Sequence, residues 1–240
     1  MKHRFILLTF LFGSGLHAQW PSFDVSNAVG SDFTDKTTPY FSMISSEIGS
    51  HPFVLRTADY RFRAGGSYHY YLPYPKYEYA QQQRGGLPFA EGIIIVTSNL
   101  ALHGMVSGVA QSTGSEQSFV HIQGWGFRLF LTDTPGNDWS LSTRFSTLNN
   151  PKNYRLTTLD AMLDKEWQIS TFHLRTGLGS NTYKAAIFID TEPAPSTVRG
   201  FTPYVSLGAV FWFQSIVFTP DMRLSNNGVQ LTLSLQKGFH

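Results

Sequence analysis

The sequence predicts an all-β protein, a transmembrane up-and-down antiparallel β-barrel of about ten strands. Three observations lead to this fold class. Only 14% of the 240 residues are charged, whereas 15% are aromatic. Apolar and polar residues alternate along many segments, which gives a strand one apolar and one polar face. The predicted connections are mostly short at one end of the strands and longer at the other, as in membrane barrels.

The N-terminus has the order of a secretory signal peptide. Lys2 and Arg4 precede an apolar stretch at 5–12, and small residues lead to Ala18, after which we expect cleavage. The apolar stretch is too short to be a membrane helix, which needs about 20 residues. Cleavage would remove 2 of the 18 basic residues and none of the 16 acidic ones, leaving 16 of each. The balanced mature chain gives no support to a nucleic-acid partner.

The absence of cysteine excludes several classes of protein. Disulfide scaffolds, zinc ribbons, iron–sulfur sites and cysteine nucleophiles all require this residue, and so does a lipoprotein anchor. We therefore divide the chain into a signal peptide (1–18), a polar extension or plug (19–58) and the barrel (59–240). Within the extension, Pro39–Ile44 and Pro52–Thr57 are candidates for extra strands.

Alternation defines the strands. In the last of them, Val229, Leu231, Leu233 and Leu235 alternate with polar residues. The ten predicted strands are 60–72, 89–97, 100–110, 118–131, 138–149, 154–164, 167–179, 201–213, 216–224 and 229–239. The count falls to eight if the weaker segments 89–97 and 154–164 are not strands, and rises to twelve if the N-terminal candidates join the barrel.

Connection lengths distinguish a barrel from a sandwich. A soluble β-sandwich turns its apolar faces inward, whereas a membrane barrel turns them toward lipid. If the first strand runs outward, loops 73–88 and 180–200 lie at the outer end, and two-residue turns such as Lys165–Glu166 lie at the other. This asymmetry favours the barrel. A secreted soluble β-sandwich is the alternative.

The closing segment resembles the last strand of bacterial outer-membrane β-barrel proteins. In that class, alternating apolar residues end in an aromatic residue that the barrel-assembly machinery recognises. The corresponding assembly-signal residues here are Val229, Leu231, Leu233, Leu235 and Phe239. The segment departs from the pattern at Lys237, on the lipid-facing parity, and at His240, which follows the aromatic residue. The resemblance implies a Gram-negative outer membrane, with its lipid and the assembly machinery as partners.

The predicted inner face collects charged residues. The lumen-lining candidates are Arg61, Arg63, His69, Arg128, Arg144, Asp160, Asp164, His173, Arg175, Asp221 and Arg223. They could form a basic constriction that attracts anions, as arginine rings do in pores. Alternatively, they fill a narrow interior with ion pairs, which we favour because small barrels pack their lumens. The predicted function is accordingly a narrow, porin-like pore or a structural and interaction barrel.

Catalysis is not expected. Ser67 and His69 share one face of the first strand, but a spacing of about 7 Å along the strand argues against a hydrogen bond between them. The eight histidines show no zinc-ligand spacing. We therefore predict no catalytic residue, metal or cofactor, and keep an outer-membrane enzyme acting on lipid as the alternative function.

The outer loops are the candidate partner sites. Loops 73–88 and 180–200 are long enough to meet a small solute or an extracellular partner. Six tyrosines lie between residues 68 and 79. They could stack on sugars, but we favour an outer aromatic belt that runs into its loop.

Overall fold

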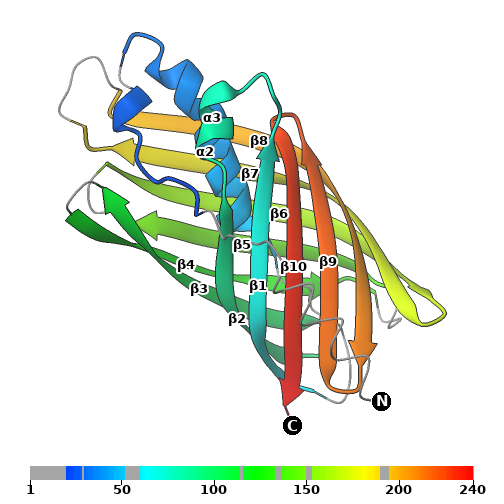
Figure 1. Ribbon diagram of the computed structural model, residues 1–240. Helices are drawn as coiled ribbons and strands as arrows, with labels where there is room; N and C mark the ends of the chain where they lie inside the picture. Colours follow the sequence, from blue (N-terminus) through cyan, green and yellow to red (C-terminus); the bar gives the residue numbers. More distant parts are fainter. Residues whose placement is uncertain are drawn as a thin grey trace, which may run out of the picture.

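The computed structural model is a closed barrel of ten antiparallel strands (Figure 1). It describes residues 20–28, 30–51, 60–113, 116–132, 137–149, 153–189 and 195–239. The strands are β1 (Phe62–Pro73), β2 (Gly86–Thr97), β3 (Leu100–Thr113), β4 (Glu116–Phe130), β5 (Trp139–Asn149), β6 (Tyr154–Ile169), β7 (Phe172–Ile187), β8 (Thr197–Phe213), β9 (Ile216–Ser225) and β10 (Gly228–Phe239). Each strand pairs with the next, and β1 pairs with β10. The predicted fold class and strand number are confirmed.

The turn between β6 and β7 lies further along the chain than predicted. The predicted turn at Lys165–Glu166 is wrong, because β6 continues to Ile169 and the chain turns at residues 170–171. Alternation persists through the charged pair. Glu166 faces the lumen and bonds to His173, while Lys165 faces outward, with its ammonium 5.5 Å from the centre of the Trp139 ring.

The two ends of the barrel differ. We call the end with the β1–β2 and β7–β8 connections (residues 74–85 and 188–196) the loop end, and the opposite end, where β10 finishes, the C-terminal end (Figure 1). Most of the outer wall is apolar, although polar residues such as Arg155, Lys184 and Arg199 are exposed on it near the loop end. Large side chains such as Trp125, Leu178 and Phe213 are about two-thirds exposed on it.

The inner wall changes character along its height. In β6, the inward side chains run from Tyr154 and Leu156 at the loop end, through Asp160, to Asp164 and Glu166 at the C-terminal end. Neighbouring strands repeat this order. The loop-end half of the interior is therefore largely apolar, whereas the other half holds most of the charged side chains, together with small apolar clusters around Val210 and Ile93.

The N-terminal segment fills the apolar half. It contains the short helix η1 (Ser26–Ala28) and the longer helix α2 (Phe33–Gly49), which lies inside the barrel against β1 and β5–β8 (Figure 1). We call residues 20–51 the plug. A third helix, α3 (Glu78–Gln82), covers α2 from the β1–β2 connection. No helix in the described ranges is long and apolar enough to span a membrane.

One strand candidate of the sequence analysis is wrong. Pro39–Ile44 lies within α2. Two features hide this helix in the sequence: Pro39 is a strong helix breaker, and α2 is buried on most sides, so it shows little of the amphipathic pattern that marks a surface helix. The second candidate, Pro52–Thr57, and the predicted signal peptide lie outside the described residues.

Candidate functional site

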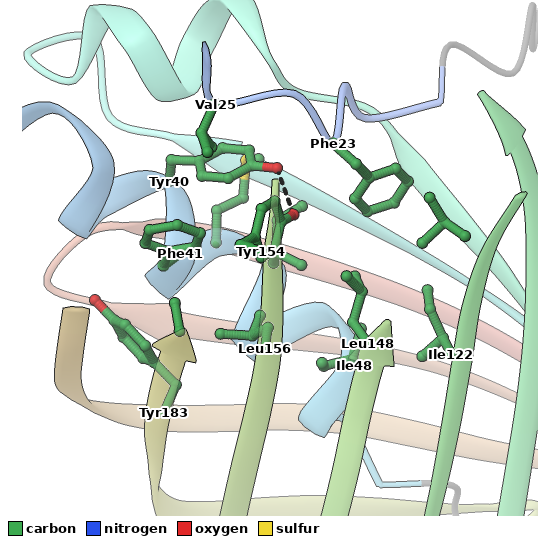
Figure 2. Packing of buried hydrophobic residues seen from close by; sticks show 14 of the residues in the cluster. Phe23, Val25, Tyr40, Phe41, Ile48, Ile122, Leu148, Tyr154, Leu156 and Tyr183 are labelled. Atoms are coloured by element: carbon green, nitrogen blue, oxygen red, sulfur yellow. Dashed lines mark hydrogen bonds between the residues drawn. The ribbon is translucent and has the colours of Figure 1, made fainter. Parts of the chain in front are cut away.

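The plug and the barrel wall share one apolar cluster. Figure 2 shows side chains from both sides packed against each other, among them Phe23, Val25, Tyr40, Phe41 and Ile48 of the plug, and Ile122, Leu148, Tyr154, Leu156 and Tyr183 of the wall. All of them are buried. The loop-end half of the lumen is thus a packed protein core.

Aromatic side chains fix how the plug sits in this cluster. The Phe41 ring meets that of Tyr154 nearly edge-on at 5.0 Å and lies 6.5 Å from that of Tyr183. The Tyr40 hydroxyl donates to the backbone carbonyl of Ser22 at 2.8 Å. Because its hydrogen is used there, Tyr154 must donate in the 2.7 Å contact between the two hydroxyls (Figure 2). Rings and hydroxyls together select one orientation of α2.

Side chains of the barrel wall donate hydrogen bonds to backbone carbonyls at the end of α2. The last carbonyls of a helix lack partners within it and carry partial negative charge. Asn181 donates to the carbonyl of residue 45 at 3.2 Å, His69 to that of residue 47 at 2.6 Å, and Arg144 to that of residue 50. Three strands thereby cap the helix and the turn that follows it.

Asp160 is the centre of the contacts below α2. Its carboxylate is fully buried and accepts hydrogen bonds from Tyr204 at 2.5 Å, His51 at 2.6 Å, Asn181 at 3.1 Å and Arg223 at 3.4 Å. Burial lowers the pKa of His51 to about 4, although Asp160 opposes the shift. The neutral ring still donates its Nε2 hydrogen, so Asp160 joins the plug to the wall.

A second buried carboxyl belongs to the plug itself. Glu47, in the last turn of α2, is fully buried, and neither carboxylate oxygen has a hydrogen-bond partner within the described part of the chain. Burial raises the pKa of Glu47 well above its usual range, and the nearby backbone amide of Tyr71 offsets this only in part. A protonated Glu47 is the form that this environment accepts.

Ion pairs fill much of the C-terminal half of the lumen. Arg175 and Asp221 lie 2.5 Å apart, and close contacts also join Arg128 to Asp164 and His173 to Glu166. Arg144 lies 4.0 Å from Glu91. The basic residues therefore face carboxylates and the helix terminus.

Most of the predicted lumen residues lie on the inner wall. Ten are buried there: Arg63, His69, Arg128, Arg144, Asp160, Asp164, His173, Arg175, Asp221 and Arg223. Arg61 is the exception, because it precedes β1 and is exposed at the rim, where its carbonyl accepts a hydrogen bond from Ile95. The sequence analysis missed Glu91, which has the inward parity of β2, and Glu47 and His51, for which no pattern gave a signal.

The prediction that Ser67 and His69 do not touch is wrong. Ser67 Oγ lies 2.9 Å from His69 Nε2. Strand spacing describes backbone positions, and the imidazole reaches back toward the serine. Because Nδ1 donates to the carbonyl of residue 47, Nε2 must accept from the serine hydroxyl. Both side chains are buried beneath the plug.

Within the tyrosine-rich segment, Tyr68 and Tyr70 are partly exposed with the outward parity of β1, whereas the loop that follows covers the plug. Tyr77 donates to Asn227 Oδ1 and Tyr79 to the backbone carbonyl of Asp24, both at 3.2 Å. The second predicted loop, 180–200, is shorter than expected, because β7 continues to Ile187 and β8 begins at Thr197. Within the described residues, no group of three or more acidic or histidine side chains could hold a metal ion.

The closing strand has its apolar face outward. Leu231, Leu233, Leu235 and Phe239 are each between 41% and 46% exposed, and Val229 is partly exposed. The ring of Phe239 lies 5.7 Å from that of Phe62 on β1, across the closing seam.

No protein-family model and no curated protein matches this chain. Among solved structures, the chain is similar to OmpTdeltaL8, a loop L8 deletion mutant of OmpT, an outer membrane protein of Vibrio cholerae. The identity is 10% and the TM-score 0.38, over 76% of this chain and 60% of that chain. Ail, the attachment invasion locus protein of Yersinia pestis, is similar at 9% identity and a TM-score of 0.27, over 74% of this chain and 94% of that chain. At such identities the similarity concerns the fold alone.

Proposed function

We propose that this chain is an outer-membrane barrel that its own N-terminal plug keeps closed, and that it serves as a structural and interaction barrel. The apolar outer wall, the apolar face of the closing strand and the closed ladder of strands support a place in lipid, where backbone groups must be satisfied internally. The single observation that carries the proposal is the apolar cluster shared by plug and wall.

A plugged lumen accounts for the interior better than a narrow pore. A conducting barrel needs a polar, water-filled interior. Here the loop-end half of the interior packs against α2, and four inward arginines of the other half, Arg128, Arg144, Arg175 and Arg223, contact carboxylates or the end of α2. The outer surface of the plug and the loops around it are then the parts that can meet a partner.

Conductance in planar bilayers tests this proposal. We expect no channel steps from the full chain and clear steps from a variant that lacks residues 20–51. Heat-modifiable gel migration would show that both barrels are folded. Steps from the full chain equal to those of the deletion variant would contradict a closed lumen.

A cross-link provides a test that does not depend on the deletion folding. The chain has no cysteine, and Ser42 Oγ of α2 lies 2.7 Å from Thr202 Oγ1 of β8. The double variant Ser42→Cys/Thr202→Cys should form a disulfide that locks the plug. If the full chain conducts and oxidation of this variant does not reduce its conductance, the plug does not close the lumen.

The contact between Ser67 and His69 keeps an enzyme as a second candidate. A serine that donates to an imidazole has the polarity of a nucleophile and its base. Acting on lipid would require the plug to move, because both side chains lie beneath it. Hydrolysis of phospholipid or lipid A by the deletion variant, lost in Ser67→Ala, would support this function, and an equal rate in both would exclude this pair.

A further inference from the structure

The plug and the β1–β2 connection line a cavity at the loop end that is partly open to solvent. Its volume is about 440 Å³, within the range of small-molecule sites, and its walls include the first turns of α2 and helix α3. From this cavity we infer a binding site for a neutral saccharide unit. The inference rests on the proposed function only in placing the loop end outside the cell.

Unused polar side chains face this cavity. Asn27, Asp35, Glu78 and Gln82 line it, and all four are exposed. Within the described residues, none of the four has a hydrogen-bond or ion-pair partner. Each carries a planar amide or carboxylate with two polar atoms, which can pair with two neighbouring hydroxyls at once. Such a set suits a polyol.

The aromatic lining of the cavity is held in place. Tyr79 meets Tyr40 of α2 edge-on at 5.8 Å and donates its hydroxyl hydrogen to the carbonyl of Asp24. The Tyr77 hydroxyl donates to Oδ1 of Asn227 in the β9–β10 turn. A lining that is ordered before the ligand arrives lowers the entropic cost of binding. Tyrosine rings also offer apolar surface to the C–H faces of a sugar.

The charges of the cavity disfavour an anion. Two lysines line it, but Lys36 Nζ lies 2.8 Å from Asp32, and Lys76 Nζ lies 4.8 Å from the centre of the Tyr77 ring. Both cations already have partners, whereas the carboxylates of Asp35 and Glu78 would repel a phosphate or sulfate. A neutral ligand rich in hydroxyls needs no free lysine and is not repelled by the two carboxylates.

Saturation-transfer NMR tests the site on the full chain in an amine-oxide detergent, which carries no sugar headgroup. The probes are a panel of neutral di- and trisaccharides and one sulfated disaccharide. We expect transfer to at least one neutral sugar, with the dissociation constant raised about tenfold in Asp35→Ala and in Gln82→Ala, as for one or two lost hydrogen bonds. Tyr74→Ala is the control, because Tyr74 is exposed on the same loop outside the cavity lining.

Three results would overturn the inference. They are the absence of transfer to every neutral sugar, preference for the sulfated probe, and binding that neither Asp35→Ala nor Gln82→Ala weakens. Heat-modifiable migration identifies a variant that has failed to fold, and Asp35→Asn then replaces it. Conductance measures the plug separately, so a chain that conducts but binds sugar would contradict the proposed function and leave the saccharide site standing.

Discussion

Replacing Phe41 by alanine should loosen the plug without unfolding the barrel. Phe41 is fully buried between plug and wall, and its ring contacts those of Tyr154 and Tyr183. Truncating a buried phenylalanine costs about 3–5 kcal/mol. The closing ladder of β1 and β10 lies elsewhere, so the cost should fall on the docking of α2.

This energy sets the size of the expected effect. Because about 1.4 kcal/mol is a factor of ten, the ratio of undocked to docked plug should rise about 10²- to 4 × 10³-fold. In planar bilayers, Phe41→Ala should therefore show opening events far more often than the full chain. Adding the Ser42→Cys/Thr202→Cys pair should abolish these events under oxidation and restore them on reduction.

A lipid-facing phenylalanine provides the matched control. Phe145 lies on the outer face of β5 and is 37% exposed. Phe145→Ala removes the same side chain without touching the plug, so its opening frequency should equal that of the natural chain. If Phe41→Ala opened no more often than Phe145→Ala while both barrels stayed folded, the apolar cluster would not be what holds the plug.

Three further changes probe the polar contacts and the seam. Asp160→Asn removes the charge of a carboxylate that contacts both Arg223 and His51 of the plug. Breaking a buried ion pair costs about 3–5 kcal/mol, so the thermal midpoint of unfolding should fall. Burial raises the pKa of Glu47 above its ordinary value of 4.5. The protonated carboxyl therefore stabilises the docked plug fully below pH 4.5, and this stabilisation is lost as pH rises through the raised pKa. Glu47→Gln should hold docking steady between pH 5 and 9, and equal pH profiles of the opening frequency for both chains would count against this assignment. In Gly65→Ala, the added methyl group would collide with the backbone oxygen of Leu235 on β10, so closure and heat-modifiable migration should fail, whereas Gly92→Ala meets no atom within 4 Å and should assemble normally.

The wall could be predicted because its outer face must be apolar where it meets the hydrocarbon of a membrane. That requirement produces alternation wherever the inner residue is polar, as in β5 and β10. Alternation weakens where the inner residue is apolar too. In β6, Leu156 faces the plug and Leu159 faces outward. In β2, Ile93 is buried with Ala101 and Phe130 inside the C-terminal end, and the adjacent Ile94 faces outward. These are the two segments that the sequence defined least well.

The inner charges could be predicted, but not all of their partners. Arg144 and His69 were identified by parity alone, yet each bonds to a backbone carbonyl at the end of α2. Every residue has a backbone carbonyl, so the residue types in the sequence do not show which carbonyls lie at a helix end. Only the position of the helix reveals that these side chains cap it. For the same reason, a spacing rule could not show that the His69 ring would turn back to Ser67.

The plug and the barrel wall bury each other's apolar surface. Without α2, the inward residues of the loop-end half, such as Leu148, Tyr154 and Leu156, would line a wide cavity with apolar surface exposed to water. Without the wall, α2 would lose its apolar partners, its caps and the Asp160 contact to His51. Each part therefore supplies what the other lacks. An open channel gains nothing from an apolar inner wall at the loop end, so the composition of the inner face supports the proposed closed state.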